Sequence, residues 1–142
     1  ELDWYLLGED LNKGLHEYVK ELLKLYRKHP ALYRIDNDWS GFEWLNADDA
    51  DRSVYSFFRK DETGKNNVLF VLNMTPMCWE NYKVGVPKKG KYKLLLNSDE
   101  KRFGGNGHVL PEELTTKAKP CNYKDNSITF DLPPYTAAIY LF

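Results

Sequence analysis

Hydrophobic residues recur at helical spacing in one part of this chain, residues 12–28. Leucine, valine and tyrosine fall there three or four positions apart, and most charged residues fall on the opposite side. This period predicts an amphipathic helix. Asp10 is the expected N-cap, and Pro30 is expected to end the helix because the residue before a proline disfavours helical backbone.

The apolar stripe of this helix needs a surface to pack on, since an isolated helix of this length is marginal in water. We expect the stripe either to dock on the rest of this chain or to stay partly without cover. A stripe without cover would promote self-association.

From about residue 52 the pattern changes to short runs typical of β-strands. Residues 52–60 and 67–73 predict a hairpin, and the second run is apolar on both faces, as in a central strand covered from two sides. Further strands are expected at residues 82–86, 91–97, 127–132 and 137–142. Residues 98–126 are polar and glycine-bearing and predict a long loop. The fold class is therefore mainly β: an antiparallel β-sandwich preceded by one amphipathic α-helix.

Composition excludes several classes of protein. The chain has 142 residues, of which 42% are hydrophobic and 15% aromatic, enough for a packed core. Its net charge is -1 with scattered Lys and Arg, so bulk charge attracts neither nucleic acid nor an anionic membrane. The longest apolar run, residues 68–72, is too short to span a bilayer.

Cysteine and histidine positions argue against a metal site. Cys78 and Cys121 lie far apart, and the three histidines are scattered, so no metal-ligand spacing occurs and no metal or cofactor is expected. The first residues, which begin without Met, do not resemble a secretory signal, and the chain looks like a piece cut from a longer protein. Free thiols then predict a cytoplasmic location.

Several short motifs follow one another in an order that carries family information. They are Gly14-Leu15-His16, Gly41-Phe42-Glu43-Trp44, the acidic Asp48-Asp49-Ala50-Asp51, Asn73-Met74-Thr75-Pro76 and Leu132-Pro133-Pro134-Tyr135. Together they resemble the region where the catalytic barrel of a glycogen branching enzyme (1,4-α-glucan branching enzyme, of the α-amylase superfamily) passes into its C-terminal β domain. The resemblance implies that residues 1–38 are the last helical segment of the barrel with a connector, and residues 39–142 the all-β domain.

The same resemblance implies the chemistry of a parent enzyme. That family cuts α-1,4 glucan and transfers the piece to a 6-hydroxyl, making the α-1,6 branches of glycogen, by a retaining route. The route needs two carboxyl groups about 5 Å apart. The motifs that carry them have no counterpart here, so we assign no catalytic residue and expect the chain alone to be inactive. The implied partners are α-1,4 glucan or glycogen and the missing catalytic barrel.

Sugar binding is the chemistry that this chain could retain. Aromatic rings pack on the C–H faces of sugars, while polar groups bind the hydroxyls. Trp39 and Trp44 stand among Asp, Asn and Ser, and Glu43 is a natural hydroxyl acceptor. We therefore predict Trp44, Glu43 and Trp39 as glucan-binding residues. Packing of Trp44 between the helix and the sandwich is the alternative.

Other functions stay open at this point. The chain could be a free-standing glucan-binding module, or the C-terminal domain of another α-amylase-type enzyme, such as a debranching or trehalose-forming one. Asp48, Asp49 and Asp51 could serve a small independent hydrolase, although adjacent carboxylates in a turn are normally solvated structural groups.

Overall fold

The computed structural model describes residues 2–142 and contains one long helix, α1, at Asp10–Lys28. The helix ends immediately before His29, which precedes Pro30, as predicted. The N-cap prediction is wrong: Glu9 occupies that position without a side-chain bond, and Asp10 is the first helical residue. A carboxylate there still interacts favourably with the helix dipole. Short 3₁₀ turns lie at Trp4–Gly8, Pro30–Leu32, Trp39–Gly41 and Lys101–Phe103.

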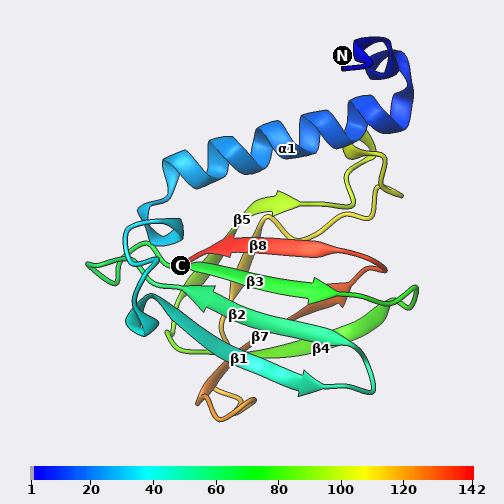
Figure 1. Ribbon diagram of the computed structural model, residues 1–142. Helices are drawn as coiled ribbons and strands as arrows, with labels where there is room; N and C mark the ends of the chain where they lie inside the picture. The colour runs from blue at the N-terminus through cyan, green and yellow to red at the C-terminus, as the bar shows by residue number, and fades with distance from the viewer. Residues whose placement is uncertain (1) are drawn as a thin grey trace.

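The strands form two antiparallel sheets that pack as a sandwich (Figure 1), so the predicted fold class is confirmed. The smaller sheet pairs β4 (Trp79–Val86) with β7 (Asn126–Leu132). The larger one has the order β1-β2-β3-β8-β5-β6, with bounds Phe42–Asp49, Val54–Arg59, Val68–Asn73, Ala137–Leu141, Lys91–Asn97 and Glu113–Thr115.

Two strands were not predicted from the sequence. Strand β1 runs through Asp48 and Asp49, which the sequence placed in a turn, and its pairing with β2 shifts register twice, so no clean alternation marks it. Strand β6 has three residues and lies within the predicted loop at 98–126, which is therefore wrong in part. In both places cross-strand pairing, rather than a local pattern, makes the strand.

The larger sheet is apolar on both faces. Its inner face packs on the β4–β7 sheet, with Leu69 and Val71 of β3 buried between them. We call the other side the outer face. There Val68 and Phe70 belong to a cluster that includes Leu25 of α1. The prediction that this strand is covered from two sides is confirmed for the inner face, whereas on the outer face Val68 is buried and Phe70 and Leu72 are half-buried. The division of the chain at residue 38 stays a prediction.

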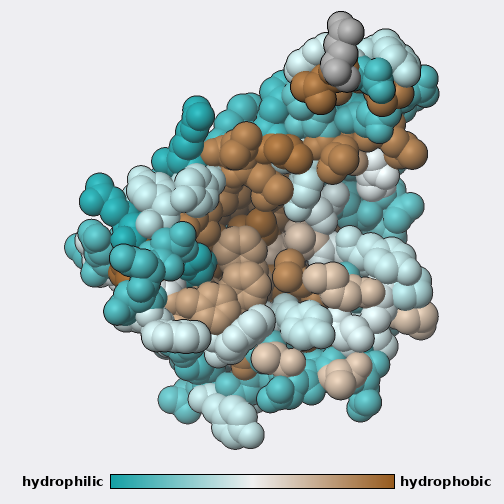
Figure 2. Space-filling view, viewed as in Figure 1, coloured by the Kyte–Doolittle hydropathy of each residue, from teal (hydrophilic) through white to brown (hydrophobic). Residues whose placement is uncertain are grey.

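The apolar stripe of α1 is only partly docked. Leu25 is buried against the sheet, whereas Leu15 and Leu23 are 59% and 55% exposed. Figure 2 shows apolar side chains along α1 and in the hollow below it, where the outer face is open to solvent. The stripe is therefore docked on the sheet at Leu25 and without cover at Leu15 and Leu23, so each of the two alternatives predicted for it holds in part.

Candidate carbohydrate-binding surface

A row of aromatic side chains crosses the outer face. Antiparallel pairing places Trp44 opposite Phe57 and Phe57 opposite Phe70, so these three rings lie side by side. The ring centroids of Phe57 and Phe70 are 4.8 Å apart and stacked, and Trp44 meets Phe57 edge-on at 5.4 Å. Such cross-strand aromatic pairs stabilise a sheet face.

Trp44 lies at the open end of this row. It is 52% exposed, and its ring contacts are with Phe42 and Phe57. The indole therefore has one packed side and one side available to a ligand.

Glu43 belongs to a different part of the surface. Its carboxylate forms ion pairs with Lys60 at 2.7 Å and Lys124 at 2.6 Å. Burial raises its pKa, but the two lysines outweigh burial and hold the pKa of Glu43 below its usual value. The structure thus does not join Glu43 to the rings of Trp44 and Phe57, because neighbouring residues on a strand point to opposite faces. Its contact with glucan stays a prediction.

Trp39 stands in the turn that precedes β1 and is 91% exposed. The Asp38 carboxylate accepts a bond from the Ser40 N–H at 2.7 Å, which fixes the turn. A Cβ at position 41 would lie 2.0 Å from the Ile35 carbonyl oxygen, so only glycine fits there. Trp39 lines a hollow of about 390 Å³ together with Ile35, Asp36, Asn37, Asp38, Phe42 and Arg59. We call this the Trp39 hollow.

Arg59 fixes the floor of the Trp39 hollow. Its Nε donates to the Gly41 carbonyl at 3.1 Å, and its Nη2 donates to the Ile35 carbonyl at 3.3 Å. Nη2 also pairs with Asp36 at 2.8 Å. Nη1 takes part in none of these bonds. Sequence reasoning missed Arg59, because pairing of β1 with β2 brings it opposite Phe42 from 17 residues further along the chain.

The architecture can now be compared with known proteins. Residues 44–142 match the family model of the alpha amylase C-terminal all-beta domain. The chain belongs to this family.

Relatives of this C-terminal domain are 1,4-alpha-glucan branching enzymes. The GlgB enzyme of Butyrivibrio fibrisolvens is 55% identical over 142 residues, which is 100% of this chain and 22% of that enzyme. The GlgB enzyme of Oceanobacillus iheyensis is 37% identical over 140 residues, 99% of this chain and 22% of the enzyme. The predicted resemblance is confirmed, and the chain spans about a fifth of the length of these relatives.

Solved structures share the fold at lower identity. A trehalulose synthase MutB structure aligns with a TM-score of 0.53 at 16% identity, over 89% of this chain and 17% of its own. The isomaltulose synthase SmuA of Protaminobacter rubrum aligns with a TM-score of 0.50 at 20% identity, over 87% of this chain and 17% of its own. At such identities the likeness shows the fold alone.

The acidic cluster of the all-β domain is tied to neighbouring side chains. Asp49 accepts from Arg52 at 2.9 Å and from the Tyr82 hydroxyl at 2.8 Å. Burial and then Asp49 itself raise the pKa of Tyr82 above its usual value. These contacts hold the β1–β2 turn on β4.

Two kinds of feature are absent from the part of the chain that the structure describes. Across residues 2–142, no three His, Cys, Asp or Glu side chains lie where they could hold a metal ion. In the same range no helix is both long and apolar enough to cross a membrane.

Proposed function

We propose that this chain is the C-terminal β domain of a cytoplasmic 1,4-α-glucan branching enzyme of glycogen biosynthesis. The observation that carries the proposal is the 55% identity over the whole chain to the Butyrivibrio fibrisolvens enzyme. The complete enzyme transfers cut α-1,4 glucan segments to 6-hydroxyls. The domain itself is non-catalytic.

A structural role follows from the uncovered apolar surface. Beneath α1 a hollow of about 460 Å³ is lined by Leu22, Leu23, Leu25, Tyr26, Leu32, Asp36, Phe42, Phe57, Arg59, Phe70 and Ile139. Each square ångström of apolar surface removed from water stabilises by about 25 cal/mol. The relatives are more than four times longer than this chain, and we propose that their catalytic barrel covers this surface. The domain binds the barrel through the exposed stripe of α1 and the side of this hollow formed by Leu22, Leu23 and Leu25. Asp36, Phe42 and Arg59, which also line the Trp39 hollow, stay open.

A second role, glucan holding, rests on the Trp39 hollow. The indole of Trp39 offers a flat apolar face, and Asn37, Asp36 and Arg59 offer donors and acceptors for hydroxyls. Phe42 lines this hollow and contacts Trp44, so the two tryptophans belong to one surface. An α-1,4 glucan packs on Trp39 and extends toward Trp44.

The parent activity is tested by domain exchange. The matching region of the Butyrivibrio fibrisolvens enzyme is replaced with this chain, and branching of amylose is followed by iodine absorbance. We expect branching within several-fold of the unchanged enzyme. A folded hybrid that cleaves glucan but forms no branches would contradict the assignment to branching enzymes and favour another α-amylase-type parent.

Glucan holding is tested by titrating the chain with maltoheptaose while tryptophan fluorescence and amide chemical shifts are recorded. Trp39→Ala should weaken binding at least tenfold. Trp4→Ala is the matched control, because Trp4 is 68% exposed but lies before α1. An unchanged dissociation constant in folded Trp39→Ala would contradict glucan holding at the Trp39 hollow. No saturation at millimolar sugar would leave the domain with a structural role only. Tight binding by a chain that stays monomeric would instead favour a free-standing glucan-binding module.

A further inference from the structure

Tyr135 adopts a backbone conformation that bulky residues seldom occupy. Its φ is 48°, in the left-handed region, and its side chain is 67% exposed. For a large L-residue this region is strained, and such strain concentrates where a side chain is held for a purpose. The turn before β8 therefore presents an aromatic ring to solvent against the local preference of the backbone.

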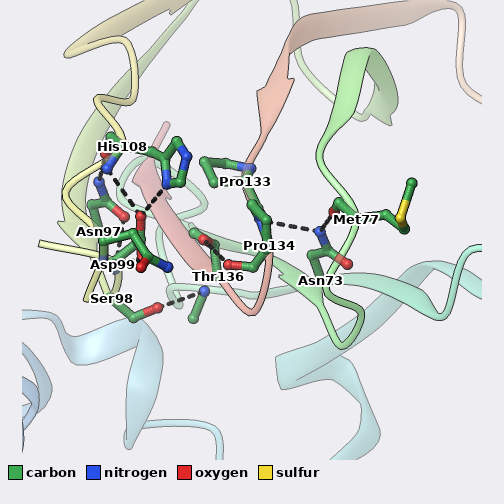
Figure 3. A network of polar contacts seen from close by, with 11 residues as sticks. Asn73, Met77, Asn97, Ser98, Asp99, His108, Pro133, Pro134 and Thr136 are labelled. Carbon is green, nitrogen blue, oxygen red and sulfur yellow. Dashed lines mark hydrogen bonds and ion pairs between the residues drawn. The ribbon is translucent and has the colours of Figure 1, made fainter. Parts of the chain in front are cut away.

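Hydrogen bonds made by Tyr135 and by Asn73 hold this conformation, and Figure 3 shows those of Asn73. Its N–H donates to the Thr75 carbonyl at 3.0 Å. The buried Asn73 side chain donates to the carbonyls of Pro133 and Met77, each at 2.8 Å. The two loops at this end of the sheet are thus tied together around Asn73, and the position of the ring is set by the fold.

The ring borders a hollow with both apolar and polar walls. Its volume is about 390 Å³, and it is lined by Tyr18, Leu72, Asn73, Met74, Ser98, Tyr135, Thr136 and Ala137. The Ser98 hydroxyl accepts a bond from the Ala137 N–H at 2.8 Å, so its own proton is not used there. An aromatic platform beside a hydroxyl donor is the combination that binds sugars. We call this the Tyr135 hollow.

Tyr123 has the same strained backbone as Tyr135 but lies beside neither hollow. Its φ is 59° and its side chain is fully exposed, yet it lines neither the Tyr135 hollow nor the Trp39 hollow. Both tyrosines have a left-handed backbone and an exposed side chain, and they differ in what lies beside the ring. Tyr123 is therefore a matched control.

The Tyr135 hollow is separate from the Trp39 hollow. Strand pairing places Ala137, two residues after Tyr135, opposite Leu72 at one end of β3. Arg59 of the Trp39 hollow pairs with Val68 at the other end. The two hollows thus lie at opposite ends of the same sheet.

We propose that Tyr135 and the hollow beside it form a second contact site for α-1,4 glucan. A glucose ring packs its C–H face on Tyr135, and its hydroxyls bond to Ser98. The inference rests on the proposed function, since that supplies the glucan as ligand. It adds a point of attachment at the far end of the sheet, so that one glucan or two can be held at separate places on the domain.

The test is Tyr135→Gly, because glycine adopts a φ near 48° without strain and the fold is kept. The chain is titrated with maltoheptaose, and amide shifts are followed at Ser98 and Thr136 for this site and at Asn37 and Ser40 for the other. We expect Tyr135→Gly to remove the shifts at Ser98 and Thr136, leaving the other pair unchanged. Tyr135→Phe should retain all four, and Tyr123→Gly should behave as the unchanged chain.

The outcomes separate this inference from the proposed function. Shifts at Asn37 and Ser40 alone would overturn the Tyr135 site and leave glucan holding intact. Shifts at Ser98 and Thr136 that persist in Tyr135→Gly would also overturn it. If neither pair responds at millimolar sugar, both glucan proposals fail.

Discussion

Gly14 of α1 lies directly against the main chain of Phe103: a Cβ at position 14 would be 2.8 Å from the Phe103 carbonyl carbon. The Phe103 ring in turn meets Tyr18 edge-on, with centroids 5.3 Å apart. These contacts attach the N-terminal half of α1 to the loop at 99–108, while Leu25 attaches the C-terminal half to the sheet. The loop thereby sets how α1 lies over the outer face.

Gly14→Ala tests this attachment. Alanine is the better helix former by about 1 kcal/mol, but its methyl group would overlap backbone that has little freedom to move. We expect the overlap to outweigh the gain in helix propensity. The free energy of unfolding, measured by urea denaturation, should then fall by about 1–2 kcal/mol. At Gly8 a Cβ would meet nothing within 4 Å, so Gly8→Ala should be near neutral. Equal effects at both positions would contradict the contact.

Asp99 organises the same loop. Its carboxylate, 5% exposed, accepts from the N–H groups of Asn106 at 2.8 Å and His108 at 2.9 Å, and lies 2.7 Å from His108 Nδ1 (Figure 3). Burial raises the pKa of Asp99, but these hydrogen bonds outweigh burial and lower it. Asp99→Asn places an amide NH₂ against the N–H donors of the loop, so the free energy of unfolding should fall by about 1–3 kcal/mol. Glu100→Gln, nearer the surface, is the control and should change it little.

The lowered pKa gives this stabilisation a defined pH dependence. A carboxyl group with a lower pKa in the folded than in the unfolded state stabilises the fold fully above its unfolded pKa, about 4. The contribution is then lost as pH falls through the folded pKa. Urea midpoints between pH 7 and pH 3 should therefore fall less steeply below pH 4 for Asp99→Asn than for the unchanged chain. Parallel curves would show that Asp99 does not contribute in this way.

Asn73 supports the Tyr135 turn through four bonds. Its side chain donates to two carbonyls and accepts from the Thr75 N–H at 3.0 Å and the Thr75 hydroxyl at 2.8 Å. Asn73→Asp removes both donated bonds and buries a charge, so unfolding free energy should drop by about 2–4 kcal/mol. Asn37→Asp, in the open Trp39 hollow, is the control and should change stability by less than about 0.5 kcal/mol. Thermal melting of both variants checks this.

The exposed stripe of α1 should make the isolated chain bind hydrophobic dye and self-associate. The double variant Leu15→Lys with Leu23→Lys should lower dye binding and self-association. The two side chains are more than half exposed, so they can be replaced with a charged residue. Val109→Lys controls for added charge, since Val109 is 90% exposed outside the stripe. Dye fluorescence and sedimentation velocity measure the result. Equal loss in the control would argue that the stripe is not the cause.

Much of the fold could be predicted from the sequence because its signals are local. Period 3.6 marks α1, and Pro30 ends it within one turn. Apolar runs mark β3 and β8, and the loop at 61–66 joins β2 to β3. Strand β1 was not predicted because its bulges break the alternation of apolar and polar residues. Strand β6 was not predicted because three residues are too few to show a pattern.

The candidate site was predicted only in part. Trp39 and Trp44 are exposed, as a ligand platform requires, and exposure of a tryptophan cannot be read from its neighbours in sequence. Pairing of β1 with β2 brought Arg59 to the Trp39 hollow. The loop before β7 brought Lys124 to Glu43. Tyr135 gave no signal, because its left-handed backbone depends on bonds made by Asn73 and Thr75.

The helix, most strands and the family can be predicted from the chain, because they depend on local periodicity and on the order of short motifs. Which faces meet water depends on the folded arrangement. Burial depends on how distant segments pack. The sheet covers Leu25 but not Leu23. Two lysines form ion pairs with Glu43, whereas Trp44 stays half exposed. The surfaces that we propose for the barrel and for glucan follow from this pattern of burial.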